Sequence, residues 1–268
     1  MKLALLFIIA VLGFSACVYK VDQPKKETGI FKDTVAYQYK TIHERAADCG
    51  SKPDSTCTVA HIKYPEFSNQ SQLNDTIKGK LIMMFAMDGK SADTSLAAMA
   101  KNFIASYERF KKESPKSPMF YELQDDVKVV QQDSALIALE YNGYTFQGGA
   151  HGASFTGFIN WNPAAKKEVL LKDVLIDNYQ PELTKIAEKI FRKNEKLSDT
   201  TSLKTNYFFK GDKFALNENY SITPLGVKFV YNQYEIKPYA AGQTELFIPY
   251  AQIKTLVRPN TVASQFLK

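Results

Sequence analysis

The sequence predicts an α+β fold built from two successive modules, with antiparallel sheets and three to four amphipathic helices. Apolar residues at alternate positions indicate strands, and apolar residues three or four positions apart indicate helices. Both patterns occur before and after a glycine-rich stretch, residues 144–152, which we interpret as the junction of the modules. With 268 residues and 45% apolar composition, the chain can bury one large core or two small ones.

Residues 1–16 are predicted to be a lipoprotein signal peptide. Lys2 precedes the apolar residues 3–14, a run shorter than the roughly 20 apolar residues of a membrane-spanning helix. The small residues before Cys17 resemble the lipobox of bacterial lipoproteins, in which this cysteine is lipidated; a chance cysteine after an ordinary signal peptide is the alternative. Residues 17–34 would then tether the protein to a membrane of the cell envelope, facing the periplasm or the exterior.

A first hairpin is expected from the alternating residues 35–44 and 58–64. Cys49 and Cys57 lie between these two runs, in a segment rich in turn-forming residues. In an exported chain, the two cysteines left after lipidation are most simply a disulfide. We therefore expect a structural bridge that closes the hairpin loop.

Two amphipathic helices are expected next, because residues 73–85 and 96–110 have apolar side chains at helical spacing. Asp75 is the expected N-cap of the first helix, and Asp93 or Thr94 that of the second.

A second hairpin is expected from residues 120–131 and 134–146, followed by a strand at residues 155–161. Asp125 and Asp126 are paired carboxylates in its first strand. Adjacent side chains of a strand point to opposite faces, so the two carboxylates cannot easily share a proton. Solvent exposure or a bulge is the expected arrangement there.

The first module is predicted to span residues 35–152, the second residues 153–257, and residues 258–268 are predicted to be a tail. The second module is expected to contain a helix at residues 183–191, strands at residues 220–223, 227–231 and 244–248, and a short helix at residues 250–257.

The net charge and the sequence motifs argue against several classes of function. The net charge is +6, from 34 basic and 28 acidic residues without a long basic run, so no nucleic-acid partner is predicted. The sequence has neither a zinc-protease His-Glu-x-x-His motif nor the Gly-x-Ser-x-Gly motif of a nucleophile elbow. His43 and His61 could meet across the first hairpin, but ordinary strand histidines are the favoured interpretation. No metal and no cofactor is predicted.

Two clusters are candidates for ligand binding. The glycine-rich stretch contains Gln147 and His151, and its missing side chains would let a sugar or a partner backbone approach. The tyrosine-rich residues 231–242 contain Tyr234, Glu235 and Tyr239, which offer aromatic faces and hydroxyl groups together. The structural alternative is a bulge or strand crossing at the glycines and a packed sheet edge at the tyrosines.

These clusters also carry a family resemblance. Residues 146–152, 170–175, 230–236 and 238–242, in this order, resemble the extracytoplasmic module of RsiV-type anti-sigma factors. The same pair of domains resembles the accessory part of PdaC-type peptidoglycan deacetylases and stand-alone lipoproteins of Bacteroidetes-type bacteria. The resemblance implies an α+β two-part module and, in the RsiV branch, lysozyme binding.

The chain departs from both families in ways that limit this resemblance. It has no counterpart of a cytoplasmic sigma-binding segment or of the catalytic deacetylase domain with its metal-binding histidines. We therefore expect a non-enzymatic, lipid-anchored envelope protein that binds a lysozyme-like protein or a peptidoglycan fragment. The alternatives are a cell-wall hydrolase or deacetylase-related enzyme using His151 with a nearby carboxylate such as Glu235, and a purely structural envelope component.

Overall fold

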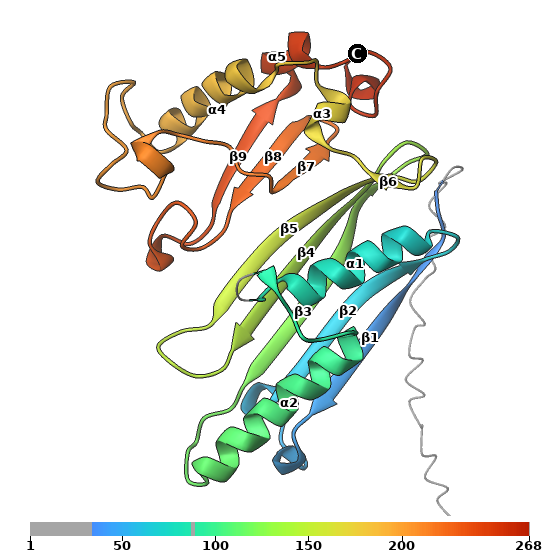
Figure 1. Ribbon diagram of the computed structural model, residues 1–268, viewed down its shortest axis with the longest axis vertical. Coiled ribbons are helices and arrows are strands. Elements are labelled where there is room, and N and C mark those ends of the chain that lie inside the picture. Colours follow the sequence, from blue (N-terminus) through green and yellow to red (C-terminus); the bar gives the residue numbers. More distant parts are fainter. Residues whose placement is uncertain (1–33, 87–88, 268) are drawn as a thin grey trace, which may run out of the picture. The chain divides into compact units, whose positions relative to one another are not determined.

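The computed structural model describes residues 34–86 and 89–267. The expected signal peptide, Cys17 and all of the expected tether except Thr34 lie outside the described residues. Within the described part of the chain, no helix is long and apolar enough to cross a membrane. The α+β class predicted from the sequence is confirmed, with one six-stranded and one three-stranded sheet (Figure 1).

The six-stranded sheet has its strands in the order of the sequence, β1-β2-β3-β4-β5-β6. Neighbouring strands are antiparallel except β2 and β3, which are parallel because a helical crossover connects them. The strands are β1 (Tyr37–Arg45), β2 (Val59–Phe67), β3 (Glu122–Gln132), β4 (Ile137–Phe146), β5 (Ala153–Asn162) and β6 (Lys167–Glu168).

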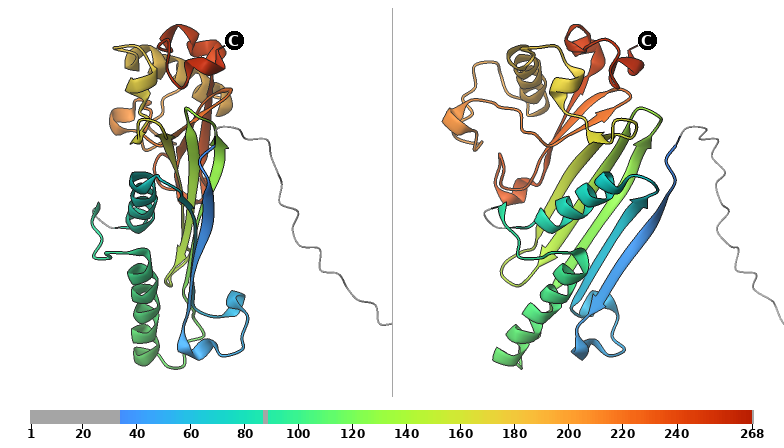
Figure 2. Two further views of the ribbon diagram at one scale, coloured as in Figure 1. Left: turned by 90° about the vertical axis from the view of Figure 1, so that its right-hand side faces the viewer. Right: turned by 45° about the vertical axis from the view of Figure 1, so that its right-hand side comes forward.

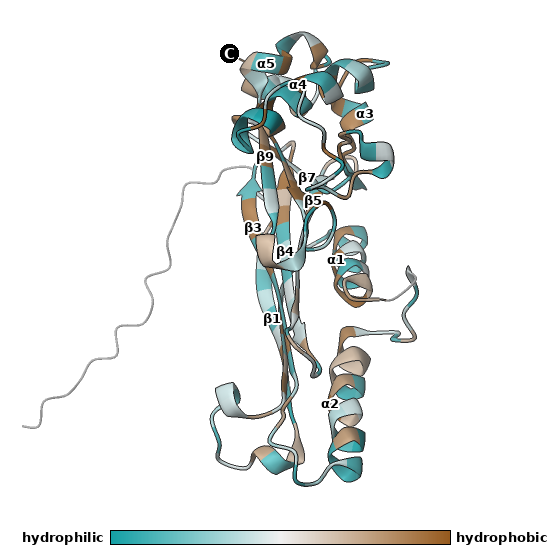
Figure 3. Cartoon of the chain, turned by 90° about the vertical axis from the view of Figure 1, so that its left-hand side faces the viewer, coloured by the Kyte–Doolittle hydropathy of each residue, from teal (hydrophilic) through white to brown (hydrophobic). Residues whose placement is uncertain are grey.

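The crossover consists of α1 (Ser71–Met83) and α2 (Leu96–Glu113), which both lie on one face of this sheet (Figure 2), called the helix face below. Figure 3 shows the same arrangement edge-on; we call the opposite face of the sheet the open face. The amphipathic pattern is confirmed, because the buried residues of α2 recur three or four positions apart. They are Leu96, Ala100, Phe103, Ile104 and Tyr107.

The predicted N-caps of these helices are wrong. Asp75 lies inside α1, which begins before it. Asp93 and Thr94 precede the true cap of α2, Ser95, whose Oγ accepts a hydrogen bond from the backbone N–H of Ala98 at 3.1 Å. A cap must reach the N–H group two or three residues ahead, and Ser95 is the residue in position to do so.

The predicted first hairpin and its disulfide are confirmed. β1 and β2 are antiparallel, and the bonded Cys49 and Cys57 have their Cα atoms 5.4 Å apart. His43 lies directly opposite His61, with 5.8 Å between ring centroids, and its Nε2 is 2.8 Å from Asp54 Oδ2. Among the described residues, no group of three His, Cys, Asp or Glu side chains is arranged to hold a metal ion.

The second hairpin, β3 and β4, is also confirmed, and Asp126 is partly exposed as expected, but the expectation of exposure or a bulge is wrong for Asp125. Asp125 is only 2% exposed, and the bulge in β3 lies further on, between Val129 and Gln131. The Asp125 carboxyl points to the helix face, since a Cβ built on Gly143 would be 2.8 Å from its Oδ1 and would also meet side chains at the end of α1. Packing of the helices on this face buries Asp125, whereas Asp126 faces the open side.

Burial raises the pKa of the Asp125 carboxyl to about 8, and the charge of Asp126 adds to the rise. Within the described part of the chain, neither of its carboxyl oxygens has a hydrogen-bond partner. Desolvation of this kind disfavours the charged form, so Asp125 is mainly protonated at pH 7.

The second module has an antiparallel sheet in the order β7-β8-β9. The predicted boundary after residue 152 falls between β4 and β5, which are neighbours in the first sheet. Residues beyond 257 also pack, since Val262 and Ala263 are buried. The elements are α3 (Leu171–Val174), α4 (Gln180–Asn194), β7 (Tyr220–Thr223), β8 (Gly226–Tyr231), β9 (Thr244–Pro249) and α5 (Tyr250–Ile253).

The buried side chain of Asn160 joins the two sheets. Its Nδ2 donates to the carbonyl of Tyr220 at 2.9 Å, and its Oδ1 accepts from the N–H of Ile222 at 2.7 Å. One amide on β5 therefore satisfies two backbone groups of β7, as a neighbouring strand would do. This contact holds the start of the second sheet beside β5.

Candidate ligand-binding site

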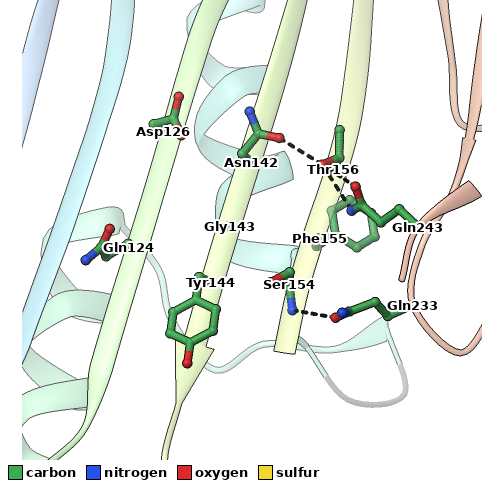
Figure 4. A pocket seen from close by; sticks show the side chains of 10 residues that line it. All are labelled: Gln124, Asp126, Asn142, Gly143, Tyr144, Ser154, Phe155, Thr156, Gln233 and Gln243. Atoms are coloured by element: carbon green, nitrogen blue, oxygen red, sulfur yellow. Dashed lines mark hydrogen bonds between the residues drawn. The ribbon is translucent and has the colours of Figure 1, made fainter. Parts of the chain in front are cut away.

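A polar pocket of about 440 Å³ lies on the open face, between β3, β4 and β5 and the segment of residues 232–243 (Figure 4). We call it the open-face pocket. Its lining residues are Gln124, Asp126, Asn142, Gly143, Tyr144, Ser154, Phe155, Thr156, Gln233 and Gln243.

The lining groups are mostly neutral hydrogen-bonding side chains. Amides and hydroxyls predominate, and Asp126 is the charged residue of the lining; its carboxylate is 3.4 Å from Lys128 Nζ. Burial raises the pKa of the Tyr144 phenol, with further contributions from Glu122 and Tyr239, so this hydroxyl stays protonated at neutral pH. Amide and hydroxyl groups both donate and accept, which suits a neutral ligand with many hydroxyl groups.

Two side chains from the second module bind the backbone of β5 and form one wall of the pocket. Asn232 Oδ1 accepts from the N–H of Thr156 at 2.8 Å, while Asn232 Nδ2 donates to the Thr156 carbonyl at 3.0 Å. Gln233 Oε1 accepts from the N–H of Ser154 at 3.3 Å. These bonds satisfy backbone groups of β5, where the Thr156 carbonyl also accepts from Asn219 Nδ2 at 2.8 Å, and they place Gln233 beside the first sheet.

The side chain of Thr156 is part of a hydrogen-bond network across this wall. Its Oγ donates to Asn142 Oδ1 at 2.8 Å and accepts from Gln243 Nε2 at 3.1 Å. Gln243 Nε2 also donates to Asn232 Oδ1 at 2.8 Å. The network fixes the orientation of the amides, so they are set before a ligand arrives.

Three aromatic residues predicted as ligand contacts meet beside this pocket; we call them the aromatic cluster. The ring of His151 stacks on Tyr239, with centroids 3.7 Å apart and planes inclined by 15°. Tyr234 completes the cluster, because its hydroxyl is 3.4 Å from His151 Nε2. Tyr234 is 58% exposed and has a φ of 65°, a left-handed conformation that is strained for a bulky residue.

The glycine-rich loop brings the aromatic cluster to the pocket. Gly148 and Gly149 have φ values of 97° and 92°, which residues with side chains rarely adopt. Gly152 is needed for close approach, since a Cβ there would lie 2.5 Å from the Tyr144 ring. His151 therefore follows a turn that only glycines permit and lies next to a pocket-lining tyrosine.

The other two residues predicted to contact a ligand, Gln147 and Glu235, are not part of the aromatic cluster. Gln147 is exposed in the loop between β4 and β5. Glu235 accepts hydrogen bonds from Asn217 Nδ2 at 2.7 Å and from the backbone N–H of Asn232 at 2.8 Å. Neither bond involves His151, whose Nδ1 lies 2.9 Å from the carbonyl of Gly152.

Sequence reasoning did not assign the open-face pocket. The sequence pattern that could have indicated it is the alternation of polar residues on three strands. This alternation places Gln124 with Asp126, Asn142 with Tyr144, and Ser154 with Thr156 on one face. Such alternation is equally typical of a face in contact with solvent. The wall that makes it a pocket comes from residues about 80 positions later.

Comparison with known proteins matches both halves of the chain. Residues 51–154 match the family model described as deacetylase PdaC, and residues 171–251 match that of a protein of unknown function, DUF3298. The two-part arrangement expected from the sequence is confirmed. The chain resembles a PdaC-type module followed by a DUF3298-type module. The PdaC-type segment contains Gln124 to Ser154 of the pocket lining, and the DUF3298-type segment contains Gln233 and Gln243.

Two solved structures have a similar fold. A DUF3298 family protein from Pseudomonas aeruginosa PAO1 has 25% sequence identity and a TM-score of 0.65, covering 85% of this chain and 96% of that one. A DUF3298 family member from Bacteroides fragilis NCTC 9343 has 20% identity and a TM-score of 0.63, covering 87% and 97%. The curated proteins include no match to this chain.

Proposed function

We propose that this chain is a non-enzymatic protein of the cell envelope that binds a glycan in the open-face pocket. The observation that carries the proposal is the lining: neutral amides and hydroxyls held in place by the Asn232–Thr156 network. Sugar hydroxyls both donate and accept hydrogen bonds, and they match such a lining better than a charged or apolar ligand does. The aromatic cluster beside the pocket offers ring faces for the apolar side of a sugar.

The envelope location is part of the same proposal. It is supported by the signal-peptide pattern before Cys17 and by the disulfide between Cys49 and Cys57, a bond typical of compartments outside the cytoplasm. A lipid on Cys17 would keep the pocket near a membrane and close to envelope glycans. Labelling with a fatty-acid analogue, lost in Cys17→Ser, tests the anchor.

Binding without turnover is proposed although the first module matches a family described as a deacetylase. The pocket carboxylate, Asp126, is paired with Lys128, and the ring nitrogens of His151 face the carbonyl of Gly152 and the hydroxyl of Tyr234 while its ring stacks on Tyr239. A hydrolase would need a positioned acid or base at the reacting bond. Mass spectrometry of the glycan after incubation with the protein tests this part, and any cleaved or deacetylated product contradicts it.

The binding test is calorimetry with N-acetylglucosamine oligosaccharides, with muropeptides and, as a protein ligand, with lysozyme. Gln243→Ala and Tyr144→Ala should each weaken glycan binding by about fivefold or more, since each removes a neutral hydrogen bond worth about 1 kcal/mol. The matched controls Gln72→Ala on α1 and the exposed Phe208→Ala should leave it unchanged. Absence of glycan binding overturns the proposal; binding of lysozyme alone would favour a protein ligand instead.

A further inference from the structure

The open-face pocket continues into two rows of side chains that cross the first sheet. One row comprises residues in direct register on five strands: His43, His61, Gln124, Tyr144 and Ser154. The second row lies beside the first, two positions away along each strand, and it comprises Thr41, Lys63, Asp126, Asn142 and Thr156.

Both rows end on the same wall, since Gln233 bonds to Ser154 and Gln243 bonds to Thr156. Neighbouring strands are about 4.8 Å apart, so five strands extend the polar surface to roughly 19 Å. The rows lie on the open face, away from α1 and α2, and all ten residues are at least partly exposed. We call this surface the polar track.

The charges along the polar track are unevenly distributed. Near the wall the charged group is Asp126, which is paired with Lys128. Towards β1 the track carries Lys63 and the facing rings of His43 and His61, of which His43 is already engaged by a carboxylate, with its Nε2 2.8 Å from Asp54 Oδ2. Lys63 Nζ lies 4.9 Å from the centroid of the Tyr39 ring, a contact that leaves an ammonium able to receive an anion. The ammonium of Lys63 is therefore the group at the β1 end that suits a ligand carrying a carboxylate.

We propose that the polar track binds a linear glycan that crosses the strands, with one end in the open-face pocket and a carboxylate-bearing sugar at Lys63. This inference rests on the proposed glycan binding and specifies the class of ligand: a glycan chain longer than the pocket that carries acidic substituents. Continuity of the track with the pocket and the ammonium of Lys63 at the β1 end both support this ligand over a single sugar or a short neutral fragment.

Calorimetry with ligands of increasing length tests the inference. The probes are the disaccharide, tetrasaccharide and hexasaccharide of N-acetylglucosamine, and a hexasaccharide alternating N-acetylglucosamine with N-acetylmuramic acid. Affinity should rise about tenfold from the disaccharide to the longer neutral chains, as one or two further hydrogen bonds would produce. The acidic hexasaccharide should bind more tightly still, and added salt should weaken it more than the neutral one.

The substitution Lys63→Gln tests the polar track independently of the open-face pocket. It should reduce binding of the acidic hexasaccharide by several-fold and leave the disaccharide unchanged, whereas the equally charge-changing Lys101→Gln on α2 should affect neither. Equal affinity for short and long chains, or an unchanged acidic hexasaccharide affinity in Lys63→Gln, overturns the track while the pocket proposal stands. If no saccharide of any length binds, both proposals fail.

Discussion

The side-chain amide of Asn232 bonds to both backbone groups of Thr156, at 2.8 Å and 3.0 Å, and so takes the place of a neighbouring strand along β5. The same amide accepts a hydrogen bond from Gln243. One side chain thus joins the second module to the first sheet and completes the wall of the open-face pocket. Stability and binding should therefore depend on it together.

Asn232→Ala should lower the free energy of unfolding by about 1–2 kcal/mol, because the N–H of Thr156 loses its acceptor while the Thr156 carbonyl keeps the hydrogen bond from Asn219 Nδ2 at 2.8 Å. It should also weaken glycan binding, since Gln233 and Gln243 lose their support. Urea unfolding and calorimetry measure the two effects. Thr156→Val, which keeps its backbone, is the control and should have a smaller effect on stability; equal losses would contradict this role of Asn232.

Asp125→Asn should remove a pH dependence of stability. The unfolded chain loses this proton near pH 3.9, but the folded protein holds it up to about pH 8. The folded state therefore binds the extra proton in this interval, and wild-type stability falls as the pH rises through it, by about 1.4 kcal/mol per pH unit for this group alone.

The stability of Asp125→Asn relative to wild type should accordingly increase by roughly 3–4 kcal/mol between pH 5 and pH 8. Urea unfolding at a series of pH values measures this. Asp126→Asn, on the open face, is the neighbouring comparison: it keeps the buried carboxyl of Asp125 and should retain most of this dependence, lessened by the loss of the Asp126 charge. A pH-independent difference between Asp125→Asn and wild type would show that the buried carboxyl is not protonated.

Reduction of the Cys49–Cys57 disulfide should destabilise the protein by about 2–3 kcal/mol, the loss expected on opening so short a loop in the unfolded chain. The measurement is urea unfolding of the wild-type chain with and without a reducing agent. The double variant Cys49→Ala/Cys57→Ala should be insensitive to the agent. If the reducing agent also shifts the urea unfolding midpoint of the double variant, the destabilisation of the wild-type chain does not come from the disulfide.

Gly152→Ala should weaken glycan binding more than it lowers stability. The added Cβ would lie 2.5 Å from the Tyr144 ring, so the ring must move within the pocket. Gly149→Ala is a useful contrast, because its positive φ imposes strain but no atom lies near its Cβ. Calorimetry should show a loss of glycan affinity chiefly in Gly152→Ala, and urea unfolding should show only a small loss of stability there. Unchanged affinity in Gly152→Ala would contradict a contact between Tyr144 and the glycan.

Local patterns predicted most of the strands and helices correctly. The alternation around residues 120–146 and the helical spacing of residues 96–110 reflect which side chains face the core, and this is largely a property of each segment itself. Helix ends were less predictable. Several polar residues precede α2, and Ser95 is the cap in place of Asp93 or Thr94 because the helix begins at Leu96.

The candidate site was predictable in part. Three of the five named residues, His151, Tyr234 and Tyr239, meet in one cluster, whereas Glu235 bonds to Asn217 and Asn232. Their role in binding stays a prediction. The open-face pocket was not foreseen, because its wall depends on contacts such as Asn232 with Thr156, which are 76 positions apart.

The sequence by itself determined the two-module α+β organisation, the hairpins and the disulfide pair, because periodicity and short spacings act along the chain. Only the tertiary structure decided the parallel pairing of β2 with β3, the burial of Asp125 and the closure of the pocket. Each of these depends on which distant segment packs against a given strand face. That packing, and not local propensity, gives an alternating strand a buried face on one side and a polar pocket on the other.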